Sequence, residues 1–291
     1  MSELRYSDKL RFKTHFSFSR MPFAKGVQAQ RMFDSSSQRE LIQGLGMWLE
    51  VKGLCGVTGP AGAGKSITLR RFAQDLDQAR FRVVSFSFLP TTPNGFLRSL
   101  CRALCLPMKL QSADLFDQVQ AYLRCHQQDQ GSHPLIVVDD CEGLPVSVLD
   151  LLRRLTSAEL DSEDHFSLVL SGTDELLRKL AHPSLESLRT RLSFVETLRP
   201  FNLEDTRNYV RYHLEHAGVA PKLISDQAVQ HLFLASQGRP RNINQLATQA
   251  LIRAAVQGRD EIDGDFMGAV IAAHPMYQAT KATSGGQKCD T

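Results

Sequence analysis

One eight-residue motif, GPAGAGKS at residues 59–66, restricts the fold of this chain more than any other feature, because it fits the pattern GxxxxGK[ST]. The motif consists of Gly59, Pro60, Ala61, Gly62, Ala63, Gly64, Lys65 and Ser66. An apolar run at residues 54–57 precedes it, and a segment with helical spacing follows it. This is the strand, loop and helix context of a phosphate-binding loop.

Each residue type in the motif suits the binding of phosphate. Glycines let the backbone turn its N–H groups inward, and the start of a helix adds positive potential. We expect Lys65 to reach the terminal phosphates, Ser66 to offer its hydroxyl to Mg²⁺, and Ile67 to complete the binding segment. The alternative, a glycine-rich turn with a solvated lysine, does not account for the strand before the motif and the helix after it.

A second apolar run ends in two carboxylates. Residues 135–138 (LIVV) are apolar enough for a strand that is buried on both faces, and Asp139 and Asp140 follow directly. Open parallel sheets bind ligands at the carboxyl ends of their strands. We predict that Asp139 holds the hydration shell of Mg²⁺ and that Asp140 orients or deprotonates an attacking water. An acidic turn after a core strand is the alternative.

Strand-like and helical segments alternate between residues 36 and 200, which predicts a parallel sheet with helices on both faces. A polar stretch at residues 126–133 is expected to be a loop. From residue 201 to residue 276 the pattern is helix after helix, which predicts a small all-helical lid. We therefore predict an α/β P-loop core at 36–200 and a lid at 201–276, with the nucleotide between them.

The two ends of the chain differ from the rest in composition. Residues 1–35 form a basic arm with interspersed aromatic residues, and residues 277–291 are a Gly/Ser/Thr-rich tail that we expect to be flexible. The whole chain has a net charge of only +3, but residues 1–31 carry seven basic and two acidic side chains. Such an arm suits contacts with DNA phosphates. The alternative is a solvated leader whose aromatic side chains dock on the core.

Neither the apolar runs nor the cysteines indicate an exported or membrane-embedded protein. No run approaches eighteen apolar residues, and the first ten residues lack the apolar segment of a signal peptide. The six cysteines form no CxxC pair, so we expect reduced thiols rather than disulfides or a zinc site. These features predict a cytoplasmic protein without direct membrane insertion.

The order of the motifs resembles that of the AAA+ ATPases. After the acidic pair, a predicted strand ends in SGT at residues 171–173, RTR at 189–191 precedes another strand, and GRPRNIN at 238–244 opens a helix. The segment HFSFSRMPF at residues 15–23 resembles the start of the ExeA-like group, which is related to the transposition ATPases TniB, TnsC and the Mu phage B protein. The resemblance covers about residues 15–275.

The resemblance implies a role at each matching position. Thr173, with Ser171 as second choice, corresponds to sensor 1, which reads the γ-phosphate or its water. Arg191, with Arg189 as the alternative, corresponds to the arginine finger that acts on the nucleotide of a neighbouring subunit. Arg241 corresponds to sensor 2, which contacts the nucleotide from the lid.

Local physical chemistry supports the interpretation of Arg241. Pro240 suits the first position of a helix, so Arg241 lies in a first turn where the macrodipole disfavours a cation by about 0.3 to 1 kcal/mol. A phosphate partner would explain this unfavourable choice.

The acidic pair departs from the Asp-Glu that is common in related ATPases. Because Asp140 is one methylene shorter than glutamate, we expect slow hydrolysis. Glu142 could substitute, but two residues further along the turn it is expected to face elsewhere. The resemblance also places Met21 to Phe23 near the adenine, although these apolar residues could instead close the core.

The resemblance implies ATP and Mg²⁺ as cofactors and a homo-oligomer with ATP at the subunit interface. It further implies binding to double-stranded DNA and a helper role in transposition, in which the oligomer selects a target or activates a transposase. Two alternatives remain open at this point: an ATPase of a general secretion pathway that acts with a membrane partner, and a slow nucleotide-dependent switch.

Overall fold

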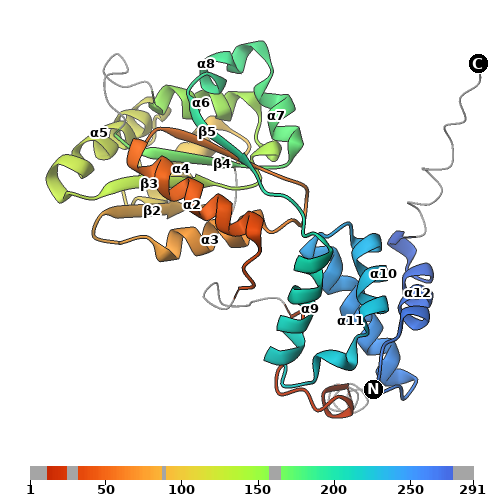
Figure 1. Cartoon of the computed structure of the whole chain (residues 1–291). Coiled ribbons are helices and arrows are strands. Elements are labelled where there is room, and N and C mark those ends of the chain that lie inside the picture. The colour runs from red at the N-terminus through yellow and green to blue at the C-terminus, as the bar shows by residue number, and fades with distance from the viewer. Residues whose placement is uncertain (1–11, 25–31, 87–89, 157–164, 278–291) are drawn as a thin grey trace, which may run out of the picture. The chain divides into compact units, whose positions relative to one another are not determined.

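A computed structural model describes residues 12–24, 32–86, 90–156 and 165–277 (Figure 1). The chain divides into two compact units. The sheet unit comprises residues 37–199, and the helical unit comprises residues 1–36 together with 200–291. Each unit is described by itself.

The sheet unit is built on five parallel strands in the order β2-β3-β4-β1-β5, which confirms the predicted parallel sheet. The strands are β1 (Leu54–Thr58), β2 (Phe81–Ser85), β3 (His133–Val138), β4 (Ser167–Ser171) and β5 (Leu192–Thr197). Every residue of the three central strands is buried, whereas β5 alternates between half-buried and exposed residues, as expected of an edge strand.

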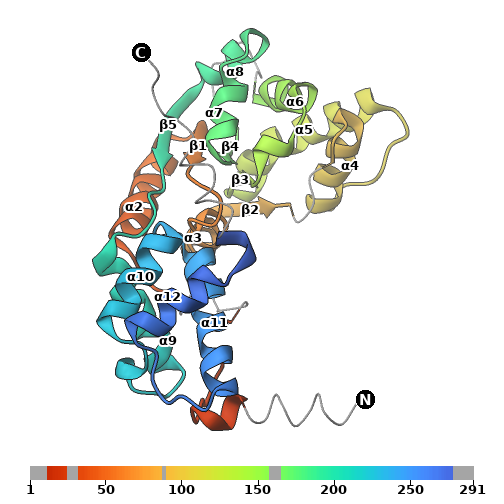
Figure 2. The same ribbon diagram turned by 90° about the vertical axis from the view of Figure 1, so that its right-hand side faces the viewer.

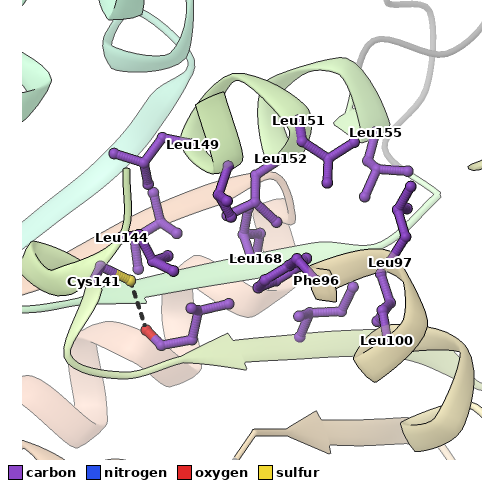
Figure 3. Packing of buried hydrophobic residues seen from close by; sticks show 14 of the residues in the cluster. Phe96, Leu97, Leu100, Cys141, Leu144, Leu149, Leu151, Leu152, Leu155 and Leu168 are labelled. Atoms are coloured by element: carbon purple, nitrogen blue, oxygen red, sulfur yellow. Dashed lines mark hydrogen bonds between the residues drawn. The ribbon is translucent and has the colours of Figure 1, made fainter. Parts of the chain in front are cut away.

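Helices cover both faces of this sheet (Figures 1 and 2). One face is packed by α2 (Ser36–Val51) and α3 (Lys65–Asp75). The other face is packed by α4 (Pro93–Ala103), α5 (Ser112–Gln130), α6 (Val146–Thr156), α7 (Asp174–Leu180) and α8 (Glu186–Arg189). Figure 3 shows the second face, where leucines of α4 and α6 meet around Phe96 and over Leu168 of β4.

In its described residues the helical unit contains four longer helices, which agrees with the predicted all-helical character. They are α9 (Leu203–His216), α10 (Asp226–Ser236), α11 (Pro240–Val256) and α12 (Gly264–Ala272). Apolar faces of all four helices form one core. Over the described residues, no helix is long and apolar enough to cross a membrane.

Several phenylalanines of the predicted N-terminal arm are part of this helical core. Phe16, Phe18 and Phe23 are buried in it, and Ser19 hydrogen-bonds the carbonyl of Ala217 through both its backbone N–H (2.8 Å) and its hydroxyl (2.9 Å). Burial of three phenyl rings stabilises this arrangement by about 1.5 to 3 kcal/mol each. Residues 12–24 therefore pack on the lid helices, while residues 1–11, residues 25–31 and the predicted tail from 278 onward lie outside the described residues.

The prediction of a loop at residues 126–133 was wrong. Helix α5 continues to Gln130, and β3 begins at His133. Gly131 ends the helix in the left-handed region at φ 68°, a conformation that glycine adopts without a Cβ penalty. The link between helix and strand is therefore much shorter than the polar composition suggested.

Candidate active site

The motif at residues 59–66 forms a tight loop between β1 and α3. Three of its glycines have positive φ: Gly59 at 146°, Gly62 at 81° and Gly64 at 108°. A Cβ on Gly59 would lie 2.5 Å from the carbonyl oxygen of Leu198, which is closer than a Cβ atom can approach a backbone oxygen without a shift of the chain. The loop therefore needs glycine both for its conformation and for its contact with the chain after β5.

Lys65 places its positive charge inside this loop. The side chain is only 6% exposed, and its Nζ donates hydrogen bonds to the carbonyls of Gly59 (2.8 Å) and Pro60 (3.3 Å). Lys65 is also the first residue of α3, so its charge adds to the positive potential of the helix N-terminus. Ser66 is exposed and Ile67 is half-buried in the same first turn. The predicted phosphate-binding residues thus lie together around one helix start.

Two further side chains form hydrogen bonds at the start of α3. The hydroxyl of Thr68 donates to the carbonyl of Gly64 (2.9 Å), and the amide of Gln38 in α2 donates to Thr68 (3.3 Å). Both side chains are buried. Their role depends on contacts between α2 and α3, and the motif alone does not reveal it.

The predicted magnesium carboxylate lies at the same edge of the sheet. Asp139 follows β3, and its Oδ1 accepts a hydrogen bond of 2.7 Å from the hydroxyl of Ser171 at the end of β4. Because β4 lies between β3 and β1, and Ser171 pairs with Val57, this bond joins the carboxylate to the strand beside β1, which leads into the loop. Ser171, the second choice for sensor 1, therefore holds Asp139.

Asp140 takes a different conformation from its neighbour. It is exposed and has φ 53° and ψ 38°, in the left-handed region that non-glycine residues seldom adopt. It precedes a short 3-10 turn, η2 (Cys141–Gly143). The turn directs the chain away from the sheet directly after the two carboxylates.

Thr173 lies two residues beyond Ser171. The intervening Gly172 donates its N–H to the carbonyl of Val57 (3.0 Å), which keeps this segment beside β1. Thr173 precedes α7, yet its side chain makes no capping hydrogen bond to that helix. The Thr173 hydroxyl therefore does not cap α7, which is the usual role of Ser or Thr at this position.

Cys141 is a structural thiol behind the carboxylates. It is fully buried and donates from Sγ to the carbonyl of Val138 (3.1 Å; Figure 3). Burial is the main cause that raises the pKa of this thiol above its usual value, so it stays protonated. All five described cysteines are free.

The predicted arginine finger lies at the opposite end of the sheet, where the parallel strands begin. Arg191 precedes β5, whose first residue, Leu192, pairs with Leu54 at the start of β1. Five strand residues at about 3.3 Å each put the start of the sheet about 16 Å from its own phosphate loop. Arg191 is half-buried and donates to the hydroxyl of Thr156 (3.2 Å), whereas the alternative, Arg189, is exposed at the end of α8.

The sensor 2 candidate belongs to the helical unit. Arg241 is exposed in the first turn of α11, which has Pro240 as its first residue, as predicted. The preceding turn is fixed by Gly238, where a Cβ would lie 1.9 Å from the carbonyl oxygen of Phe201. Nearby, Arg239 has a buried Nε without a hydrogen-bond partner. Two guanidinium groups therefore lie near the positive end of this helix.

The oxygen donors of the site fit magnesium better than a transition metal. Asp139 and Ser66 offer a carboxylate and a hydroxyl, which are ligands that Mg²⁺ accepts when phosphates and water complete its octahedron. Among the described residues, no group of three or more His, Cys, Asp or Glu side chains could hold a metal ion. These residues would hold Mg²⁺ together with a nucleotide, and the ion would neutralise phosphate charge there.

Comparisons with known proteins agree with this geometry. Residues 49–180 match a family described as an AAA domain. Over 251 residues the chain is 29% identical to the general secretion pathway protein A of Aeromonas hydrophila; the match covers 85% of this chain and 45% of that protein. The chain thus spans less than half the length of this relative.

Solved structures share the fold at low identity. The Aeropyrum pernix Orc1 protein in complex with DNA has a TM-score of 0.61 at 16% identity, covering 90% of this chain and 71% of that one. Cdc6p of Pyrobaculum aerophilum has a TM-score of 0.58 at 21% identity, covering 86% and 68%. The RuvB Holliday junction branch migration motor of Thermotoga maritima has a TM-score of 0.55 at 17% identity, covering 84% and 72%. The predicted P-loop AAA+ fold is therefore confirmed.

The geometry of the loop makes a prediction for stability. Gly59→Ala should destabilise the protein by about 2 to 4 kcal/mol, since the new Cβ meets the Leu198 carbonyl in a strained backbone conformation. Gly46→Ala is the matched control, because Gly46 lies exposed within α2 with no atom within 4 Å of the new Cβ. The control should stabilise the protein by about 0.5 to 1 kcal/mol. Urea denaturation measures both changes, and equal effects would contradict the described loop.

Proposed function

We propose that this protein binds ATP with Mg²⁺ at the loop of residues 59–66, hydrolyses it slowly, and assembles in its ATP-bound state on double-stranded DNA as a helper in transposition. The observation that supports ATP binding most strongly is the placement of Lys65. Its charge lies inside a glycine loop at a helix start, with Asp139 anchored by Ser171 at the same edge of the sheet. This combination suits a triphosphate with its magnesium ion.

In this proposal each residue has a separate role in hydrolysis. Lys65 and the N-terminus of α3 bind the terminal phosphates, Ser66 and Asp139 hold Mg²⁺, and Asp140 orients the attacking water or takes its proton. Thr173 contacts the γ-phosphate or the water, because its hydroxyl is free of a capping role. Arg241, in the first turn of α11, takes the role of sensor 2.

The position of Arg191 supports an assembly of several copies. About 16 Å of sheet separates it from the phosphate loop of its own chain, so it can serve as an arginine finger only for a neighbouring copy. There its guanidinium would neutralise charge on the γ-phosphate, an effect that contributes about three to five orders of magnitude in rate. Arg189 takes this role if the bond from Arg191 to Thr156 persists in the assembly.

Support for DNA as the surface of assembly comes from charge and from relatives. Lys13 and Arg20 of the basic arm are exposed on the helical unit. Of the proteins that share the fold, one was solved in complex with DNA and another is a branch migration motor. A transposase is the partner that the resemblance to TniB, TnsC and the Mu phage B protein favours.

One observation favours a second candidate function. The curated relative with 29% identity is a general secretion pathway protein, so this chain could instead act as an ATPase in secretion with a membrane partner. In that role the protein should sediment with membranes in cell extracts. In the transposition role it should remain in the supernatant and bind duplex DNA.

The assembly is expected to depend on the nucleotide. With a non-hydrolysable ATP analogue and duplex DNA, light scattering should show particles of several copies, while ADP should leave the chain in smaller species.

Raising the salt concentration from 50 to 200 mM should weaken DNA binding by at least about tenfold, because phosphate contacts release counterions. One of the two variants Arg191→Ala and Arg189→Ala should bind ATP but fail to assemble, and the other should assemble like the natural protein. Particles of equal mass in ATP analogue and ADP would contradict the proposal.

The short carboxylate at position 140 makes a separate prediction. Asp140→Glu should raise the steady-state rate of phosphate release about tenfold, since the longer side chain reaches the water better. Asp140→Asn should lower the rate at least about a hundredfold because it removes the base. Rapid turnover by the natural protein that neither change alters would exclude Asp140 as the water-orienting residue.

A further inference from the structure

The turn after the acidic pair is tied to α7 by a lysine. Lys179 in the last turn of α7 is half-buried, and its Nζ donates to the carbonyls of Glu142 (2.5 Å) and Leu144 (2.6 Å). Both carbonyls belong to η2 and its C-cap. Hydrogen bonds from a charged group are stronger than those between neutral groups, so this is a firm connection between η2 and α7.

The side chain of Glu142 lies against Gly172, in the segment that leads into α7. Its Oε2 is buried without a hydrogen-bond partner and lies 2.7 Å from the point where a Cβ on Gly172 would be. The same point is 2.9 Å from the Cβ of Leu176 in α7. The absence of a side chain at Gly172 therefore makes room for the carboxylate, at the junction between β4 and α7.

The arrangement of Glu142 is costly for stability alone. A buried polar atom without a hydrogen-bond partner destabilises the folded state, and a charged one does so more strongly. Local choices that oppose stability are concentrated at functional sites. Here the carboxylate joins the surroundings of two candidate residues. Glu142 follows Asp140 by two positions, and Gly172, against which its carboxylate lies, directly precedes Thr173.

We propose that Lys179 and Glu142 are positioning residues for ATP hydrolysis. Together with Gly172 they form what we call the turn–α7 contact, which holds the segment of Asp139 and Asp140 at a fixed spacing from Thr173. Neither side chain has to touch the nucleotide, because each acts through the segment that it holds. The inference rests on the proposed function, since it assigns a spacing that matters only when water attacks the γ-phosphate.

The test compares Lys179→Met with Arg178→Met in the full chain. Arg178 is the matched control because it is adjacent on α7 and exposed, and because its one ion pair within the described part of the chain is with Glu175 at the surface. A misplacement of about 1 Å can cost a hundredfold in rate, so Lys179→Met should lower kcat by about ten- to a hundredfold. Its affinity for a non-hydrolysable ATP analogue and its KM should stay within about threefold of the natural protein. Lys179→Arg keeps a charged donor and should recover part of kcat.

A double variant tests whether the two residues act together. Glu142→Ala should also lower kcat with little change in KM, and combining it with Lys179→Met should be no worse than either change alone, because residues that act as a unit are not additive. The proposal is overturned if Lys179→Met retains full kcat, or if kcat and analogue affinity fall together as in general unfolding. If the natural protein itself shows no ATP turnover, the proposed function fails. If it turns over ATP and Lys179→Met matches it, only the positioning role fails.

Discussion

The close contact between Gly59 and the carbonyl of Leu198 is the constraint on which the rest of the site depends. It fixes where the chain leaves β1, and the positive φ angles of Gly62 and Gly64 then return it to the start of α3. Lys65 closes the loop by hydrogen bonds to its carbonyls. Positive charge and helix dipole are thus concentrated before any ligand arrives, so binding an anion needs little reorganisation.

The strand order extends this site to the other side chains. Because β4 lies between β1 and β3, the ends of three strands meet at one edge, and Ser171 can reach Asp139 from the strand next to the loop. The opposite end of the sheet carries Arg191. One parallel sheet therefore separates the groups that we propose for a chain's own nucleotide from the group that we propose for a neighbour's nucleotide. This separation links the fold to the proposed assembly.

Sequence reasoning succeeded where chemistry is local. The loop at 59–66 and the carboxylates at 139 and 140 follow from residue types next to apolar runs, and the structure places both at one sheet edge. It failed for short or polar elements: the helical turns of α5 beyond residue 125 lack an apolar pattern, and α7 and α8 have only seven and four residues. Such short helices show too few turns for their periodicity to be recognised.

Contacts between segments far apart in the chain could not be predicted from the sequence either. Lys179 and Glu142 are 37 residues apart, and nothing in either neighbourhood indicates their connection. The burial of Phe16, Phe18 and Phe23 on the helical unit likewise depends on a surface formed by residues about 200 positions later. A basic and aromatic composition predicted an arm, but tertiary packing determined where its aromatic side chains lie.

Whether the loop at 59–66 binds a nucleoside triphosphate can be measured by calorimetric titration of the natural protein with an ATP analogue. In the presence of Mg²⁺ we expect one site per chain with a dissociation constant in the micromolar range, about −8 kcal/mol. No heat of binding at millimolar nucleotide with Mg²⁺ present would contradict it.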